Sequence, residues 1–381
     1  MKKLAIAIAL RFVVLVFLLL IFVYIINAQE LESNKFPNDY RGIIHLHSEL
    51  SRDSDGKFED IIKAAQNNEV DFVVITDHWS KNLFEQSRSG LFGTTLIIAG
   101  AEIEKREGVS MITFPLPKDF VPSESWQKDV EILRKSGSIV LAEHIEFSET
   151  HQLMGFDGIE VINLHAHILQ QNKFGLASTY FQALLPWNWN LAYIFTEIPG
   201  LKRWYYLNQE KPMPAFGGND THDNYRLFYL AGPKLGSYDN TFKLITTHIW
   251  ADELSEKYVK EAVKKGQSYF AFEVFGNSKG FKFYASLQQV QGKQSDTEVF
   301  FPGNPIPRGL ENKKITIAVQ APPHKDPSKT KIKILREGKV IKEGFGILLN
   351  LENPKPGNYY AEIWRDEKPW IFSNPIEIRP D

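Results

Sequence analysis

Apolar runs rich in β-branched residues recur along the first two thirds of the chain, and each run ends in polar residues. In order, these segments are RGIIHLHS, DFVVITDH, TTLIIAGAEIE, SIVLAEH, GIEVIN and AFGGNDTH. Short apolar runs of this kind predict buried strands. The polar residues that end them are mainly histidine, aspartate and glutamate, the side chains that bind metals or transfer protons.

Two helices are predicted between the strands from a 3.6-residue apolar period. In the segment 57–68, one face carries Phe58, Ile61, Ile62 and Ala65. In the segment 125–136, the corresponding face carries Trp126, Val130 and Leu133. Gly137 then suits the C-cap of the second helix. Alternating strands and helices predict an α/β fold with a mainly parallel sheet or barrel, whose active site forms where the strands end.

Beyond residue 280 the pattern changes to short alternating strands separated by Gly, Pro and Asn, without a helical period. This pattern predicts a small Ig-like β-sandwich over 281–381. Its clearest local signal is a hairpin that turns near Glu337 and Gly338. We therefore expect an α/β domain over 38–278, followed by the sandwich.

The segment 1–28 is predicted to be a targeting segment. A basic start and an apolar run over 12–26 precede Ala28, a small residue suited to cleavage of a signal peptide. Because 4–10 is also apolar, the segment could instead remain as a signal anchor, with Arg11 reaching the cytoplasmic interface. We expect the protein to be exported, either periplasmic or secreted, or to be anchored to the membrane by this segment.

The composition narrows the chemistry that is open to the protein. The chain has 381 residues, a formal net charge of -2 and no cysteine. Without a basic surplus, no nucleic-acid partner is expected. The lack of cysteine excludes disulfides, thiolate nucleophiles and sulfur-ligated metals, so a bound metal would have nitrogen and oxygen ligands.

The residues at the strand ends together predict a metal site. His45 and His47 are two residues apart, so their imidazoles project from the same face of a strand. Further potential ligands follow the other predicted strands: His78, Glu102, His144, Asp220 and His222. Such ligands suit Zn²⁺, Mn²⁺ or Fe²⁺. Asn163, His165 and His167 lie at or just past another strand end and are candidates to reach the same site.

The ordered motifs HLHS, SDG, ITDH, GAEI, LAEH, GIEVIN and GGNDTH resemble the PHP superfamily, named for polymerase and histidinol phosphatase, over residues 41–275. The resemblance implies a distorted (β/α)7 barrel with two or three divalent metals at the carboxyl ends of its strands, acting on phosphoesters in most branches. It implies that one metal is held by His45, His47, Glu102 and Asp220. It implies that Glu102 bridges to a second metal, held by Asp55, His78 and His222, and that His144 completes the cluster.

Two departures from the family pattern favour two metals over three. Residues 103–143 contain no histidine, although many members carry one there. The position usually occupied by histidine in three-metal members is Asp55, with Asp53 as the competing residue.

The expected chemistry follows from the ligand types. Two divalent ions lower the pKa of a bound water enough to give hydroxide, so no protein nucleophile is needed. We expect Asp55, Asp220 and His222 to take part in catalysis, by holding the ions or by relaying a proton to the leaving group.

The stretch 165–210 is dense in aromatic side chains and is the expected source of substrate specificity. Its aromatic residues from 174 onward are Phe174, Tyr180, Phe181, Trp187, Trp189, Tyr193, Phe195, Trp204, Tyr205 and Tyr206. They fit the core of helices that cover the barrel, an apolar wall that contacts substrate through Trp187 and Trp204, or a surface against the membrane. Lys202 and Arg203 are candidates to contact an anionic substrate.

These observations predict an exported metal-dependent phosphoesterase that acts on a small-molecule or lipid ester. An ending such as WIFSNPIEIR after a PHP domain also resembles exported members related to carbaryl hydrolase, which cleaves a carbamate ester. A carboxyl or carbamate ester is therefore the alternative substrate. The other alternative is a barrel that has lost catalysis and serves as a binding module, against which the nearly complete ligand set argues.

Overall fold

The computed structural model of the chain describes residues 36–104, 109–143, 155–169, 198–209, 212–224, 226–228, 231–234, 236–289, 297–307 and 313–379. The chain forms two compact units, Met1–Asn38 and Asp39–Asp381. The predicted targeting segment, His144 and the aromatic residues from 174 to 195 lie outside the described residues, so those predictions stay predictions. Within the described ranges, no helix is long and apolar enough to cross a membrane.

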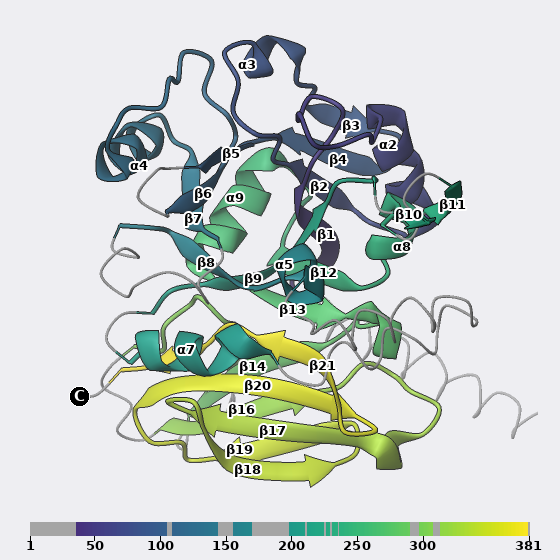
Figure 1. Cartoon of the computed structure of the whole chain (residues 1–381). Coiled ribbons are helices and arrows are strands. Elements are labelled where there is room, and N and C mark those ends of the chain that lie inside the picture. Colours follow the sequence, from purple (N-terminus) through teal and green to yellow (C-terminus); the bar gives the residue numbers. More distant parts are fainter. Residues whose placement is uncertain are drawn as a thin grey trace, which may run out of the picture. The chain divides into compact units, whose positions relative to one another are not determined.

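A row of paired strands builds the first part of the larger unit (Figure 1). Its members are β1 (Asn38–Leu46), β2 (Phe72–Ile75), β4 (Thr95–Ala99), β5 (Ala101–Glu104), β6 (Ser110–Phe114), β7 (Ile139–Ala142), β8 (Gly158–Asn163) and β9 (Ala215–Thr221). They pair in the order β4–β2–β1–β9–β8–β7–β6–β5, and β3 (Gly90–Phe92) adds to β4. Because the chain passes directly from β4 to β5 through Gly100, the two ends of the row are contiguous in the chain.

The row contains both parallel and antiparallel pairs, so the expectation of a mainly parallel arrangement is only partly right. The strand β1 is parallel to β2 and β9, and β8 is parallel to β7 and β9. In contrast, β6 is antiparallel to both β5 and β7. Only five residues separate Glu104 from Ser110, whereas a parallel crossover needs about a dozen or more. The result is a mixed α/β fold.

The structure confirms both predicted helices. The helix α2 (Phe58–Asn67) buries Phe58, Ile61 and Ala65, each large apolar side chain contributing about 2 kcal/mol. The helix α4 (Trp126–Lys135) packs on β7 and begins at Ser125, whose side chain accepts a hydrogen bond from the backbone of Lys128. It ends before Gly137, which has a φ of 88°, a conformation that glycine adopts without strain.

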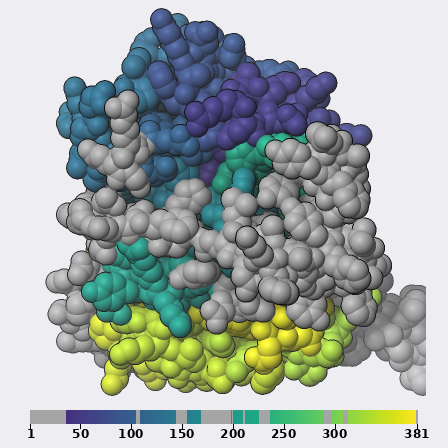
Figure 2. Space-filling view, viewed as in Figure 1, coloured from purple at the N-terminus to yellow at the C-terminus, as the bar shows by residue number. Residues whose placement is uncertain are grey.

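Two antiparallel sheets enclose a second apolar core in the carboxyl-terminal third. One sheet contains β14 (Lys282–Gln289), β15 (Thr297–Phe300), β16 (Lys313–Gln320) and β19 (Leu348–Glu352). The other contains β17 (Thr330–Arg336), β18 (Lys339–Phe345), β20 (Gly357–Arg365), β21 (Lys368–Ser373) and β22 (Ile376–Ile378). Residues of this third, yellow-green in the space-filling view, form a continuous surface (Figure 2).

The predicted hairpin joins β17 to β18. Its turn residues Glu337 and Gly338 both have positive φ, at 49° and 73°. Two successive residues of this kind form the tight turn whose twist matches that of paired strands.

The second of these sheets continues into the first part of the unit, so the two parts share one sheet. The strand β12 (Ile245–Ala251) lies next to β1 and pairs with β13 (Ser268–Phe272), which pairs with β21. Asn374, just after β21, donates to the backbone carbonyl of Ala215 at the start of β9 and to that of Ser268. The helix α7 (Pro199–Leu207) adds a contact from Tyr205 to Glu362 of β20, a hydrogen bond of 2.8 Å. The remaining helices with described bounds are α3 (Leu83–Gln86), α5 (Leu164–Leu169), α8 (Tyr238–Thr241) and α9 (Glu256–Lys265).

Candidate metal centre

The carboxyl ends of β1 and β9 carry the inner part of the site, and both have a strained residue there. His45 has a φ of 69° and Asp220 a φ of 49°. Residues other than glycine rarely adopt this conformation, and such strain collects at functional sites. The backbone turns at these two positions aim both side chains at the same point.

Four side chains, which we call the inner group, converge there: His45, His47, Glu102 and Asp220. Nε2 of His45 lies 3.4 Å from Oε2 of Glu102 and 3.5 Å from Oδ1 of Asp220. Nε2 of His47 lies 3.0 Å and 3.3 Å from the same two oxygens. Ligands about 2.0–2.2 Å from an ion in a tetrahedral shell lie about 3.3–3.6 Å from one another. The four donor atoms are thus spaced as the ligands of one ion are.

Glu160 holds His45 from the opposite side of the ring. Its Oε1 lies 2.7 Å from Nδ1 of His45, and its Oε2 accepts a hydrogen bond of 3.1 Å from the amide of Asn163. This carboxylate fits only because residue 218 is glycine, since a Cβ at Gly218 would lie 1.7 Å from Oε1. A carboxylate on Nδ1 orients the imidazole and leaves Nε2 to bind a metal. Asn163, a candidate ligand from the sequence, therefore supports Glu160 instead.

Ser51 orients His47 in a similar way. Its hydroxyl donates to Oδ1 of Asp77 at 2.7 Å, and the same oxygen lies 3.0 Å from Nδ1 of His47. Because the hydroxyl proton is committed to Asp77, the oxygen accepts from Nδ1–H and leaves Nε2 of His47 as the metal-binding atom. Asp77 also accepts hydrogen bonds from the backbone and hydroxyl of Ser48, at 2.6 and 2.7 Å, and so anchors the loop after β1.

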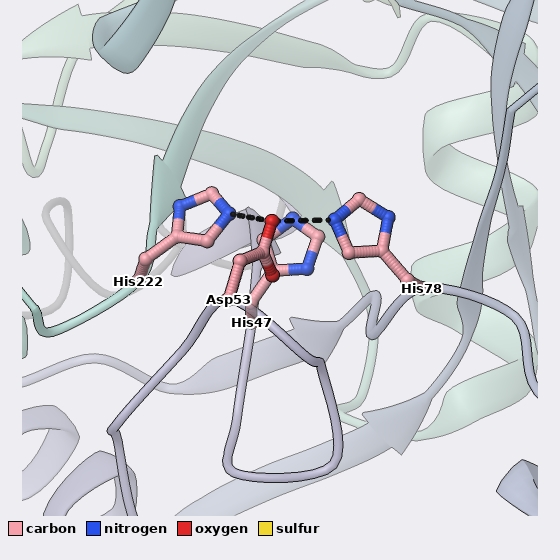
Figure 3. A group of neighbouring side chains, drawn as sticks. All are labelled: His47, Asp53, His78 and His222. Atoms are coloured by element: carbon pink, nitrogen blue, oxygen red, sulfur yellow. Dashed lines mark hydrogen bonds and ion pairs between the residues drawn. The ribbon is translucent and has the colours of Figure 1, made fainter.

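An outer group, Asp53, His78 and His222, lies beside the inner one. Oδ2 of Asp53 lies 3.0 Å from Nε2 of His78 and 3.5 Å from Nε2 of His222 (Figure 3). Nδ1 of His78 lies 3.6 Å from the Oε2 of Glu102 that also faces the inner group. Glu102 therefore lies between the two groups, the place that the family resemblance implies for a bridging ligand.

The structure corrects the choice between the two aspartates of the loop after β1. The carboxylate of Asp53 faces the two imidazoles of the outer group, whereas Asp55 is exposed and belongs to none of the potential metal-binding groups among the described residues. The loop fold explains the exchange. Ser54 donates to the backbone carbonyls of His47 and His222, and the backbone N–H of Asp55 also donates to that of His222. These bonds fold the turn so that residue 53 points inward.

His165 reaches the site, and His167 does not join it. Nδ1 of His165 lies 3.3 Å from Nδ1 of His222 and 3.9 Å from Oδ2 of Asp220. His167 is buried and belongs to none of the potential metal-binding groups in the described part of the chain.

The inner imidazoles and carboxylates stabilise each other's charges. Burial opposes a charged imidazole, but Asp220 and Glu102 raise the pKa of His47 to about 9. Against the same effect of burial, Asp220 and Glu160 hold the pKa of His45 well above its ordinary value. Despite its own burial, Asp220 has a pKa well below the usual range because His45 and His47 are close. The carboxylates are therefore ionised and ready to accept a cation.

His222 behaves in the opposite way. Burial and the positive charge of His47 lower the pKa of His222 to about 4. Its imidazole is therefore neutral at physiological pH, the form that binds a metal.

Two glutamates of the site were missed from the sequence, although both lie in the motifs quoted above. Glu160 is the glutamate of GIEVIN, and Glu143 is that of LAEH. Oε2 of Glu143 lies 3.5 Å from Nε2 of His45. Burial and the negative charge of Glu102 raise the pKa of Glu143 well above its ordinary value. A glutamate inside or directly after a fully apolar strand was the signal, because such residues are almost never buried without a partner.

Trp204 lies in the core, so the prediction that it contacts substrate is wrong. Its side chain is fully buried, and its ring centroid lies 5.2 Å from those of Tyr205 and Tyr360. Its Nε1 donates to the carbonyl of Met213 at 2.8 Å. On the same helix Lys202 is exposed and Arg203 is half-buried, and their predicted contact with substrate stays a prediction.

The donor set of the two groups fits divalent metal ions. Nε2 of His47, Nδ1 of His78 and both side-chain oxygens of Glu143 are buried without a hydrogen-bond partner among the described residues. Buried polar atoms are rarely left in this state, and an ion satisfies several of them at once. The atoms are imidazole nitrogens and carboxylate oxygens, which Zn²⁺, Mn²⁺ and Fe²⁺ accept. The chain thus contains a histidine and aspartate cluster that can hold metal ions.

No protein-family model and no curated protein matches the chain. Two solved structures are similar to it. PsfC from Pseudomonas syringae PB-5123 shares 13% sequence identity with a TM-score of 0.39, over 62% of this chain and 92% of PsfC. Endonuclease Q, in complex with a 27-mer duplex that has an abasic lesion at the active site, shares 13% identity with a TM-score of 0.35, over 59% of this chain and 56% of its own. Similarity of this degree assigns neither an activity nor a substrate to this chain.

Proposed function

We propose that this chain is a metal-dependent hydrolase of the PHP superfamily, that it acts on ester bonds, and that phosphoesters are its substrate class. The observation that carries the proposal is the convergence of the inner group, whose donor atoms lie 3.0 to 3.5 Å apart. The row of strands from β1 to β9, with the site at the carboxyl ends of its members, is the arrangement expected of the PHP barrel.

The inner group would hold one divalent ion through Nε2 of both histidines and through the carboxylates of Glu102 and Asp220. The outer group would hold a second ion, with Glu102 between the two. Such ions, when bound, supply a hydroxide nucleophile at neutral pH and polarise the ester oxygen. A degenerate barrel is the less favoured alternative, since every described candidate position of the inner group has kept its ligand.

Exposure indicates the side from which substrate enters. The side chain of His45 is 1% exposed, whereas those of His78 and Asp53 are 16% and 44% exposed. The inner group is therefore the floor of the site, and the Asp53 side is its mouth. His165, with 29% of its side chain exposed, lies next to Asp220 and His222. Its imidazole is placed to give a proton to the leaving group.

The proposal also covers location, on the sequence pattern alone. The segment 1–28 would direct export of the protein, so the substrate would be a small-molecule or lipid ester outside the cytoplasm. Mass measurement of the mature amino terminus, together with fractionation of cells, tests whether this segment is removed or retained as an anchor.

The test of activity is hydrolysis of three nitrophenyl esters, a phosphate monoester, a phosphodiester and a carboxyl ester, by the purified protein loaded with Mn²⁺ or Zn²⁺. We expect turnover of a phosphoester, reduced roughly 100-fold or more in Asp220→Asn, because loss of a ligand costs at least as much as loss of its hydrogen-bonding support. Turnover of the carboxyl ester alone would move the protein to the carbamate-like alternative. Absence of turnover on all three esters by protein with bound metal would contradict the proposal.

A further inference from the structure

We propose that Glu143 is an additional ligand of the inner ion, and that it biases the centre towards Mn²⁺ or Fe²⁺ relative to Zn²⁺. The inference rests on the proposed function, because it needs a metal in the inner group. It concerns a residue that lies outside the four positions implied by the family resemblance.

The first argument is position. Oε2 of Glu143 lies 3.5 Å from Nε2 of His45. The corresponding distances to that nitrogen are 3.5 Å for Oδ1 of Asp220 and 3.4 Å for Oε2 of Glu102. Three carboxylate oxygens from three different strand ends thus surround one imidazole nitrogen at nearly equal distances. This is the spacing of atoms that share an ion.

The second argument is the lack of any other partner. The side chain of Glu143 is 0% exposed, and neither of its oxygens has a hydrogen-bond partner among the described residues. A buried carboxylate in this state is costly unless a cation neutralises it. Glu160 provides a contrast, because its two oxygens are engaged by Nδ1 of His45 and by Asn163. Glu160 is thus a positioning residue, whereas Glu143 has its oxygens available for a metal.

The third argument is the number and kind of donors. With Glu143, the inner group offers two imidazole nitrogens and three carboxylate oxygens. Zn²⁺ usually takes four ligands in a tetrahedron, and five only in some states. A site rich in oxygen and with more than four donors suits Mn²⁺ and Fe²⁺ better. Glu143 therefore raises the affinity for Mn²⁺ more than that for Zn²⁺.

The test compares Glu143→Gln with the wild-type protein. Mn²⁺ binding is titrated by counting free Mn²⁺ from its electron paramagnetic resonance signal, and Zn²⁺ binding by competition with a chelator dye. We expect the Mn²⁺ dissociation constant to rise about tenfold or more, and the Zn²⁺ constant to rise less. Glu143→Asp keeps the charge but withdraws the oxygen, so it should weaken Mn²⁺ binding as well.

The matched control is Glu362→Gln, which changes a buried glutamate of β20 that bonds to Tyr205. We expect it to leave both metal affinities unchanged. Unaltered Mn²⁺ binding in folded Glu143→Gln and Glu143→Asp would overturn the inference, and equal weakening of Mn²⁺ and Zn²⁺ would overturn the bias. Failure of the wild-type protein to bind either metal would instead refute the proposed function, before any variant is compared.

Discussion

Oε1 of Glu160 lies 2.7 Å from Nδ1 of His45, and both side chains are buried. The contact joins β8 to β1 across 115 residues of sequence. It sets which nitrogen of His45 faces the inner group, so the metal-binding geometry depends on a residue that is not itself placed to touch the metal.

Glu160→Gln tests this dependence. The amide keeps an oxygen that accepts from Nδ1–H, but it loses the charge that makes the imidazole a stronger ligand. We expect affinity for Mn²⁺ and for Zn²⁺ to fall together by about tenfold, as measured by the titrations described above. A change in the ratio of the two affinities would show that Glu160 acts as a direct ligand instead.

The loop after β1 offers a matched pair of substitutions. Asp53→Asn removes the carboxylate that lies between His78 and His222, so we expect loss of one of two bound ions and roughly 100-fold lower ester hydrolysis. Asp55→Asn changes an exposed side chain two residues away, and we expect both values to match the wild type. Metal analysis of the purified proteins gives the ion count. The reverse result, with Asp55 essential, would contradict the geometry of the outer group.

Asn374 connects the sandwich to the strand that carries Asp220. Its side chain accepts from the backbone N–H of Ala215 at 2.7 Å and donates to the carbonyls of Ala215 and Ser268. Asn374→Ala removes these buried contacts, so we expect the free energy of unfolding to fall by about 3 kcal/mol. Denaturant unfolding measures the loss. Asn350→Ala, on an exposed position of β19, is the control and should change stability by less than about 0.5 kcal/mol.

A separate buried charge cluster, at the amino-terminal end of β1, predicts pH-dependent stability. Nδ1 of His248 lies 2.7 Å from Asp39, and its Nε2 lies 3.1 Å from Glu273. Burial opposes the charge on His248, but Asp39 and Glu273 raise its pKa above the usual 6.5. Glu273 is also buried, yet hydrogen bonding to His248 lowers its pKa from 4.5 to about 2.

The sign of the effect follows from these directions. A raised pKa of His248 stabilises the fold fully below pH 6.5, and this contribution is lost as the pH rises through the folded-state pKa. The lowered pKa of Glu273 stabilises the fold above pH 4.5 and is lost as the pH falls towards 2. We expect His248→Gln to cost about 3 kcal/mol near pH 6, and less at pH 9. A deficit that grows between pH 6 and pH 9 in denaturant unfolding would contradict this account.

Local features of the fold could be read from the sequence because they depend on neighbouring residues. The helix over 58–67 follows from apolar residues three and four apart, and the turn at Glu337 and Gly338 follows from the strands on either side. The inner group was also accessible, because each of its members ends an apolar run and the ends of sheet strands meet in space.

Tertiary structure alone decided the rest, because those features depend on contacts between residues far apart in sequence. Glu143 and Glu160 belong to the site only through His45, which another strand supplies. The inward direction of Asp53 depends on hydrogen bonds to the carbonyl of His222. The continuity of one sheet from β12 to β21 likewise depends on pairing between Tyr269 and Ser373. Sequence determined which residues could bind metal, and the packing of the strands determined which of them meet.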